Sequence, residues 1–190
     1  NGRREEVGRG FFQGQGSAKG IDVLLQKKRG KLNGWLGYSY GKVEHTFPDF
    51  NSGLTFPASH DRTHEINLVG KYRLGDWELA ATWVYATGKA YTAPISQYYV
   101  DLLDGSEFSY IHVSDKNSQR LPNYHRLDFS ISRSFYFDTT KWVAGFSLFN
   151  LYNNKNVWYR QYDLDVQPVA VTDVTMLGFT PTVFVQIYSH

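Results

Sequence analysis

The chain has 190 residues, which suits one domain, and its net charge of +2 is too small to indicate nucleic-acid binding. It contains no cysteine, a composition compatible with export without disulfides and equally with the cytosol. Aromatic residues make up 17% of the chain, the mean hydropathy is −0.43, and no apolar run approaches the roughly 20 residues of a membrane helix. This composition fits a membrane β-barrel and also a soluble β-sandwich.

Seven strand-length segments alternate apolar and polar residues along the chain. Residues 65–72, for example, read E-I-N-L-V-G-K-Y. A period of two places alternate side chains on opposite faces of a sheet, and here one face is large and apolar while the other is small, polar or charged. The predicted strands are residues 17–28, 32–43, 64–73, 77–87, 125–137, 142–150 and 179–188.

The connections between these segments alternate between short and long. Short turns are expected at residues 29–31, 74–76 and 138–141, and long loops at about 44–60, 88–124 and 151–176. Within the second loop, residues 98–102 and 108–113 flank Asp104-Gly105, a hairpin signal. The third loop is polar and rich in Tyr and Asn.

This pattern is typical of an antiparallel transmembrane β-barrel, with lipid outside, a wet lumen, short periplasmic turns and long extracellular loops. Trp77 and Trp142 each follow a short turn, where an aromatic girdle is expected. Seven strands cannot close a barrel, and the chain opens without the apolar core of a signal peptide. We therefore expect the wall segment of a larger barrel, with the glycine-rich residues 8–20, including Phe11 and Phe12, continuing the first strand.

Charged residues within the strands predict which face meets water. The alternation assigns five of them to the lumen, and it places Arg133 in the apolar row between Ile131 and Phe135. Such a charge is tolerable only near the short-turn rim, where a long side chain reaches the headgroups. The five lumen positions are Asp22, Glu65, Lys71, Glu78 and Asp128.

Two polar clusters resemble reactive sites only superficially. His60 and His64 are four residues apart, a spacing that suits a metal on a helix, but this segment leads into a strand. The cluster Tyr124, His125, Arg126 and Asp128 opens the fifth predicted strand and lacks a nucleophile.

No dinucleotide site is expected either, because Gly14, Gly16 and Gly20 miss the fingerprint spacing and no helical pattern follows. We predict no enzyme activity, no metal and no cofactor. Aromatic side chains in the long loops are the candidates for solute contact, since their faces stack on sugars or flat siderophores; the alternative is that they only pack the loops. They are Tyr91, Tyr98, Tyr99, Tyr110, Trp158, Tyr159 and Tyr162.

Six segments together carry a family resemblance, in their order and spacing. The segments are G-S-A-K-G-I-D-V-L-L-Q-K (16–27), G-W-L-G-Y-S-Y (34–40), F-P-A-S-H-D-R-T-H-E-I-N (56–67), W-V-Y-A-T-G (83–88), L-P-N-Y-H-R-L-D (121–128) and F-N-L-Y-N-N-K-N (149–156). This set resembles the C-terminal barrel region of TonB-dependent receptors of the Gram-negative outer membrane, in the branch with a carboxypeptidase-regulatory-like N-terminal domain.

The resemblance implies the last third of a barrel of about 22 strands that takes up a scarce solute of the siderophore, glycan or peptide class. Its implied partners are membrane lipid, a plug domain, the remaining strands, a TonB-type energy-coupling protein and a surface lipoprotein lid. The resemblance also implies that Asp61 and Arg62 belong to a rim motif and pair with neighbouring strands. Two alternatives stay open. One is an outer-membrane docking platform for a surface or periplasmic partner, and the other is a soluble carbohydrate-binding β-sandwich whose apolar rows lie between two sheets. An outer-membrane enzyme lacks a convincing triad.

Overall fold

The computed structural model describes residues 12–101, 103, 105, 107–166 and 169–189, and these residues form an all-β fold of antiparallel sheets. The predicted roles of Gly8, Phe11 and Asp104 fall outside the described residues. Among the helices in the described part of the chain, none has the length and apolar character needed to cross a membrane.

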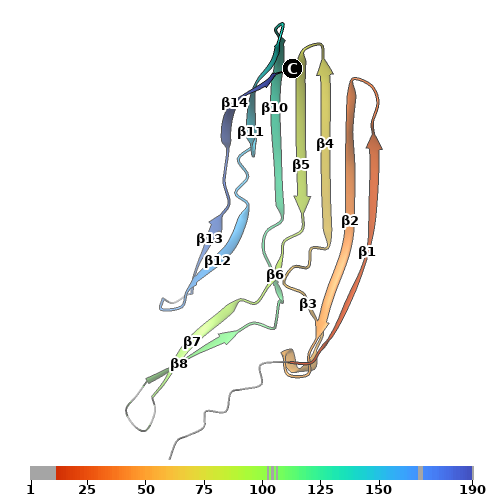
Figure 1. Ribbon diagram of the computed structural model, residues 1–190. Coiled ribbons are helices and arrows are strands. Elements are labelled where there is room, and N and C mark those ends of the chain that lie inside the picture. The colour runs from red at the N-terminus through yellow and green to blue at the C-terminus, as the bar shows by residue number, and fades with distance from the viewer. Residues whose placement is uncertain (1–11, 102, 104, 106, 167–168, 190) are drawn as a thin grey trace, which may run out of the picture.

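One large sheet contains all seven predicted strands, which confirms that part of the sequence analysis. Each strand pairs antiparallel with the next main strand along the chain, so the sheet is an up-and-down meander (Figure 1). The strands are β1 (Gln15–Lys27), β2 (Leu32–Thr46), β4 (His64–Leu74), β5 (Trp77–Ala86), β10 (Tyr124–Tyr136), β11 (Thr140–Phe149) and β14 (Thr180–Ser189).

The long connections carry further short strands. The pair β3 (Phe56–Pro57) and β2 extends the large sheet, and β6 (Ala90–Tyr91) pairs with β9 (Gln119–Arg120). The predicted hairpin is confirmed as β7 (Pro94–Asp101) and β8 (Glu107–Val113). A one-turn 3-10 helix occupies Asn51–Gly53.

The long loop expected for residues 151–176 carries a hairpin that the sequence analysis did not identify, formed by β12 (Val157–Asp163) and β13 (Ala170–Thr175). Both strands are rich in β-branched or aromatic residues, reading V-W-Y-R-Q-Y-D and A-V-T-D-V-T. The asparagines that precede β12 form a turn of their own. Their polarity obscured the strand signal that follows them.

All long connections lie at one end of the sheet and all short ones at the other (Figure 1). The short turns are residues 28–31, 75–76 and 137–139, and two of them use glycine in the left-handed region, Gly30 at φ 98° and Gly75 at φ 58°. The long connections cover residues 47–63, 87–123 and 150–179. This arrangement matches the expected alternation of short and long.

The register aligns the apolar residues of successive strands on one face. One cross-strand row consists of Leu32, Tyr72, Leu79, Ile131, Phe146 and Val183. The next row belongs to the opposite face and is polar or small: Asn33, Lys71, Ala80, Ser130, Ser147 and Thr182. Because side chains alternate along each strand, this two-row pattern defines an apolar face and a polar face for the whole sheet.

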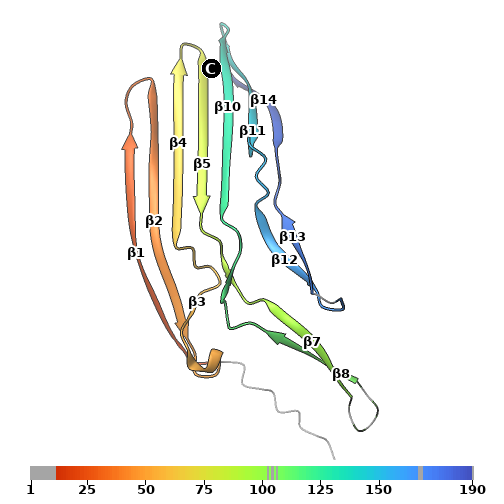
Figure 2. The ribbon, with the colours of Figure 1, turned by 180° about the vertical axis from the view of Figure 1, so that it is seen from behind.

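The apolar face is uncovered. Figures 1 and 2 show the main strands as a single curved layer, with the small hairpins extending beyond its long-connection end. Val183 is 75% exposed and Leu25 62%, although both belong to the apolar rows. The buried apolar residues among those described lie in or beside the long connections instead: Phe56, Ala58, Ala86, Ala90 and Ala93.

The polar face holds the five charged residues assigned to it from the sequence, as the strand register confirms. Glu78 is paired with Lys71 at 2.6 Å and with Arg73 at 3.3 Å. Asp128 is paired with Arg126 at 2.9 Å. Charges on this face are therefore mostly balanced by neighbours on the same face.

Candidate functional site in the long connections

Asn150 anchors the start of the last long connection to the end of the sheet. Its side chain is fully buried, and its backbone is in the left-handed region at φ 53°, which asparagine tolerates better than most residues. The side-chain Nδ2 donates to the carbonyls of Asn154 (2.9 Å) and Leu177 (3.3 Å), and Oδ1 accepts from the Asn154 N–H (3.0 Å). The Asn150 N–H donates to Asp128 on β10 (2.9 Å).

Two further asparagines in the same turn bind the backbone of β10. Asn154 and Asn156 both donate from Nδ2 to the carbonyl of His125, at 3.1 and 2.9 Å. The His125 N–H donates in return to Oδ1 of Asn156 at 3.0 Å. The polar segment 150–156 therefore forms an ordered turn. Its side-chain amides hydrogen-bond to the backbone of β10 beyond the point where β11 ends. We call Asn150, Asn154 and Asn156 the asparagine turn.

Asp61 joins the first two long connections. It is 2% exposed, its Oδ1 accepts from the Val43 N–H of β2 at 2.8 Å, and its Oδ2 pairs with Arg120 of β9. Arg120 also donates to the carbonyls of Asp61 (3.3 Å) and Gly88 (3.0 Å). The expectation that Asp61 pairs with a neighbouring strand is confirmed, and Arg120 is a partner that the sequence did not indicate.

The residues at the start of β10 divide between the two faces. On the polar face, Arg126 donates to the Tyr124 hydroxyl (3.0 Å) and to Asp128 (3.0 Å), and its guanidinium lies 4.0 Å from the centroid of the Phe149 ring. On the other face, Nδ1 of His125 lies 2.9 Å from the Tyr152 hydroxyl. The guanidinium of Arg126 therefore contacts Tyr124, Asp128 and Phe149 and holds their side chains together.

The histidines and the neighbouring arginine singled out near β4 have separate environments. Nδ1 of His64 lies 2.9 Å from the Tyr38 hydroxyl, and the His60 ring lies 6.5 Å from that of His45. Arg62 is 3.6 Å from Glu65. Within the described ranges, no group of three or more His, Asp or Glu residues is arranged to hold a metal ion.

A tyrosine pair connects the second and third long connections. The hydroxyls of Tyr91 on β6 and Tyr162 on β12 lie 2.9 Å apart. Arg160 donates to the Tyr91 hydroxyl at 3.2 Å and to Asp173 of β13 at 2.8 Å. Burial and the hydrogen bond with Tyr91 raise the pKa of Tyr162 to about 12, and the bonds to Tyr91 and Asp173 raise the pKa of Arg160 above its ordinary value.

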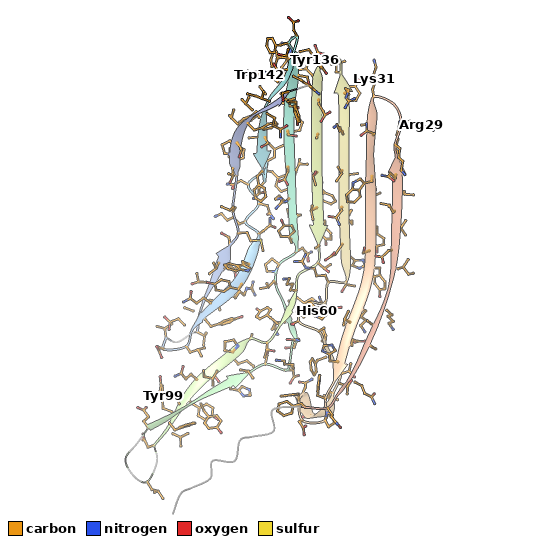
Figure 3. All side chains as sticks on the ribbon, in the orientation of Figure 1. Arg29, Lys31, His60, Tyr99, Tyr136 and Trp142 are labelled. Carbon is orange, nitrogen blue, oxygen red and sulfur yellow. The ribbon has the colours of Figure 1, made fainter. Side chains whose placement is uncertain are left out.

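A second contact between the same connections involves Tyr99. Its hydroxyl donates to Asp165 at 3.3 Å and accepts from Gln97 at 2.8 Å. Partial desolvation, followed by the Asp165 charge, raises the pKa of Tyr99. Figure 3 shows Tyr99 on the β7–β8 hairpin, far from the short turns of the sheet.

The other candidate aromatics form two exposed pairs. Tyr98 and Tyr110 stack across the β7–β8 hairpin with ring centroids 5.6 Å apart and an interplanar angle of 14°. Trp158 and Tyr159 meet edge-to-face at 5.2 Å on β12, and Trp158 is 63% exposed. Trp158 also lines a hollow of about 30 Å³ between the connections, which has room for one water.

The seven predicted site residues therefore form three groups and not one pocket. Tyr91, Tyr99 and Tyr162 hold the long connections together, whereas the stacked pair and the tryptophan pair present aromatic faces to solvent. Arg160 is a site residue that the sequence analysis did not predict, because its partners Tyr91 and Asp173 are distant from it in the sequence. A scan against family models, a search of curated proteins and a search of solved structures gave no match for this chain.

Proposed function

We propose that this chain is a wall segment of a transmembrane β-barrel in a Gram-negative outer membrane, and that the barrel is a TonB-dependent transporter for a scarce solute. The observation that carries the proposal is the uncovered apolar face of the sheet. Val183, Val185 and Ile187 of β14 are 75%, 58% and 58% exposed. Burying such a side chain is worth about 1.5–3 kcal/mol, and lipid provides that burial without a second protein layer.

The soluble sandwich would bury these same rows against a second sheet. Within the described residues, the remaining strands form two-stranded pairs beyond the end of the large sheet and leave its apolar face open. A water-soluble protein rarely exposes a continuous apolar surface of this extent. The exposed rows therefore favour the membrane interpretation.

The two edges of the sheet support a larger barrel. In the described sheet β1 pairs only with β2 and β14 only with β11, so each has one edge without a strand. Unpaired backbone groups are costly in lipid, where only closed barrels satisfy every strand. Further strands, to a total of about 22, are the partners that this proposal assigns to β1 and β14.

The polar face suits contact with a plug domain. At its short-turn end a hollow of about 580 Å³ is lined by Gly30, Lys31, Asn33, Lys71, Arg73 and Gly75. Glu78 balances part of this positive charge, and acidic groups of a plug would balance the rest. The long connections then face outward, where the stacked tyrosines and the tryptophan pair contact the solute, a siderophore, glycan or peptide. A TonB-type partner and a surface lipoprotein lid complete the proposed assembly.

The membrane part of the proposal is testable by site-directed spin labelling, because the chain contains no native cysteine. Phe146→Cys and Val185→Cys label the apolar face, and Ser147→Cys and Thr82→Cys label the polar face. In the membrane-embedded protein, oxygen should relax the first two labels more strongly, and a water-soluble nickel chelate the second two. Equal access of the nickel chelate to all four labels refutes the barrel.

The transport part has its own test. Cells that contain the protein should accumulate the radiolabelled solute, and deleting the energy-coupling protein or collapsing the proton gradient should abolish accumulation while surface binding persists. Ile111→Ala on the opposite face of the hairpin and Tyr98→Ala in the stacked pair form a matched comparison. Tyr98→Ala should weaken solute binding about fivefold or more, since loss of aromatic stacking costs about 1 kcal/mol. Accumulation that continues without the proton gradient contradicts active uptake.

A docking platform remains the second candidate, favoured by the β7–β8 hairpin. Both faces of this hairpin expose large apolar residues, between 40% and 54% of each side chain, in addition to the stacked tyrosines. They are Ile95, Val100, Phe108, Ile111 and Val113. A photo-crosslinking residue at Phe108 should give a defined adduct with a surface protein in intact cells. Its absence, with solute binding intact, leaves transport as the sole function.

A further inference from the structure

Arg133 lies on the apolar face near the short-turn end of β10. Its neighbours on that face along the strand are Ile131 and Phe135, and its cross-strand partners are Trp77 and Ala144. Trp77 is the first residue of β5, so this row is close to the Gly75 turn. A charge in the apolar row is expected only near the short-turn rim, and the register places Arg133 there.

The guanidinium of Arg133 is held by aromatic rings. Its central carbon lies 5.4 Å from the centroid of the Trp77 ring and 5.2 Å from that of Phe135, both within cation–π range. Phe135 is the cross-strand partner of Trp142, so a third aromatic residue belongs to the same end of the apolar face. The side chain of Arg133 is exposed, and in the described residues no carboxylate lies within ion-pairing distance of it.

We infer that Arg133, Trp77 and Phe135 form a binding site for the phosphate group of an anionic phospholipid; this inference depends on the proposed membrane location of the face. A guanidinium matches a phosphate with two parallel hydrogen bonds, and its planar fork is preoriented by the rings. Aromatic side chains at this level pack against the glycerol and the upper acyl chain. A free phosphate ion would gain the same hydrogen bonds but would make no apolar contact with the rings.

Lys141 offers a matched control on the same hairpin. Its ammonium lies 5.5 Å from the Tyr136 ring and 5.9 Å from the Tyr188 ring, so it is also a cation over aromatic rings. The register places Lys141 opposite Tyr136 on the polar face, whereas Arg133 is opposite Ala144 on the apolar face. Figure 3 shows Tyr136 and Trp142 at the same end of the sheet. The two cations differ mainly in the face that they occupy.

The test is native mass spectrometry of the full protein that carries this chain, released from nanodiscs of equal phosphatidylglycerol and phosphatidylcholine. The wild type should retain phosphatidylglycerol preferentially. Arg133→Gln should reduce this preference about fivefold, the effect of one cation near a membrane surface. Arg133→Lys should retain part of the preference, because it keeps the charge and loses the fork. Lys141→Gln should match the wild type.

Several outcomes overturn the inference. The inference is wrong if Arg133→Gln retains phosphatidylglycerol as preferentially as the wild type does. It is also wrong if Lys141→Gln loses as much of this preference as Arg133→Gln. Competition by inorganic phosphate at millimolar concentration indicates a free-anion site. If Arg133→Gln does not insert into the nanodisc, the phosphatidylglycerol preference of Arg133→Lys is compared with that of the wild type instead. A partial loss supports the site, and no loss contradicts it. The spin-label pattern described above, recorded on the same nanodiscs, separates the two proposals: a protein that inserts without lipid preference refutes only the site, and one that does not insert refutes both.

Discussion

Replacing Asn150 tests whether the asparagine turn fixes the last long connection. Its side chain makes three hydrogen bonds to backbone groups and is fully buried. At about 1 kcal/mol for each lost bond, Asn150→Gly should destabilise the turn by about 3 kcal/mol. Asn150→Ala should cost about 1 kcal/mol more, because alanine disfavours the left-handed backbone at φ 53°. The bond from the Asn150 N–H to Asp128 survives in both variants.

Hydrogen exchange measured by mass spectrometry provides the readout. A cost of 3 kcal/mol raises the opening equilibrium of residues 150–156 about 100-fold, and Asn150→Ala should raise it several-fold further. The centre of the β10–β11 hairpin should exchange at the wild-type rate. Two results refute the reasoning: wild-type protection of the turn in Asn150→Gly, or an equal loss of protection across the whole sheet. The first means that the side-chain bonds contribute nothing, and the second that Asn150 stabilises the sheet itself.

Tyr91→Phe should lower the pKa of Tyr162 from about 12 towards 10, as measured by near-ultraviolet absorbance. Because the folded pKa is raised, the stabilisation by Tyr162 is complete below pH 10 and is lost between pH 10 and 12; the variant should lose less. Gly88→Ala places a Cβ against a backbone carbonyl of the facing segment and should sharply increase proteolysis of residues 87–123. Arg120→Leu leaves the buried Asp61 unpaired and should cost about 2–3 kcal/mol in urea unfolding, somewhat below the usual range because Arg120 is 39% exposed.

The main sheet could be predicted from the sequence because its signals are local. Period-two alternation identifies the strands, and glycine at Gly30 and Gly75 identifies the turns. Arg133 was assigned to the apolar face because it lies two residues from both Ile131 and Phe135, and the register confirmed this assignment. A shift by one residue would reverse every side chain of a strand, so a consistent apolar face over seven strands leaves little freedom in the pairing.

The geometry of the long connections could not be predicted in the same way, because its decisive contacts join residues far apart in sequence. Asp61 and Arg120 are 59 positions apart, and Tyr91 and Tyr162 are 71 apart. No local pattern links such residues. The candidate aromatics were identified by type, but only the fold separates Tyr91 and Tyr162, which bind each other, from Tyr98, which presents its ring to solvent.

In the proposed transporter, the distribution of buried residues allows the ligand preference to change without loss of the fold. Main-sheet stability depends on backbone pairing and, in our proposal, on lipid against the apolar face. The buried polar groups lie instead in the long connections, with Asp61 near the end of the first and Asn150 at the start of the third. They fix the bases of the connections, while the stacked Tyr98 and Tyr110 lie farther along a hairpin with few buried side chains. Substitutions in that hairpin should therefore alter solute binding with little effect on the sheet, whereas substitutions at the bases should affect both.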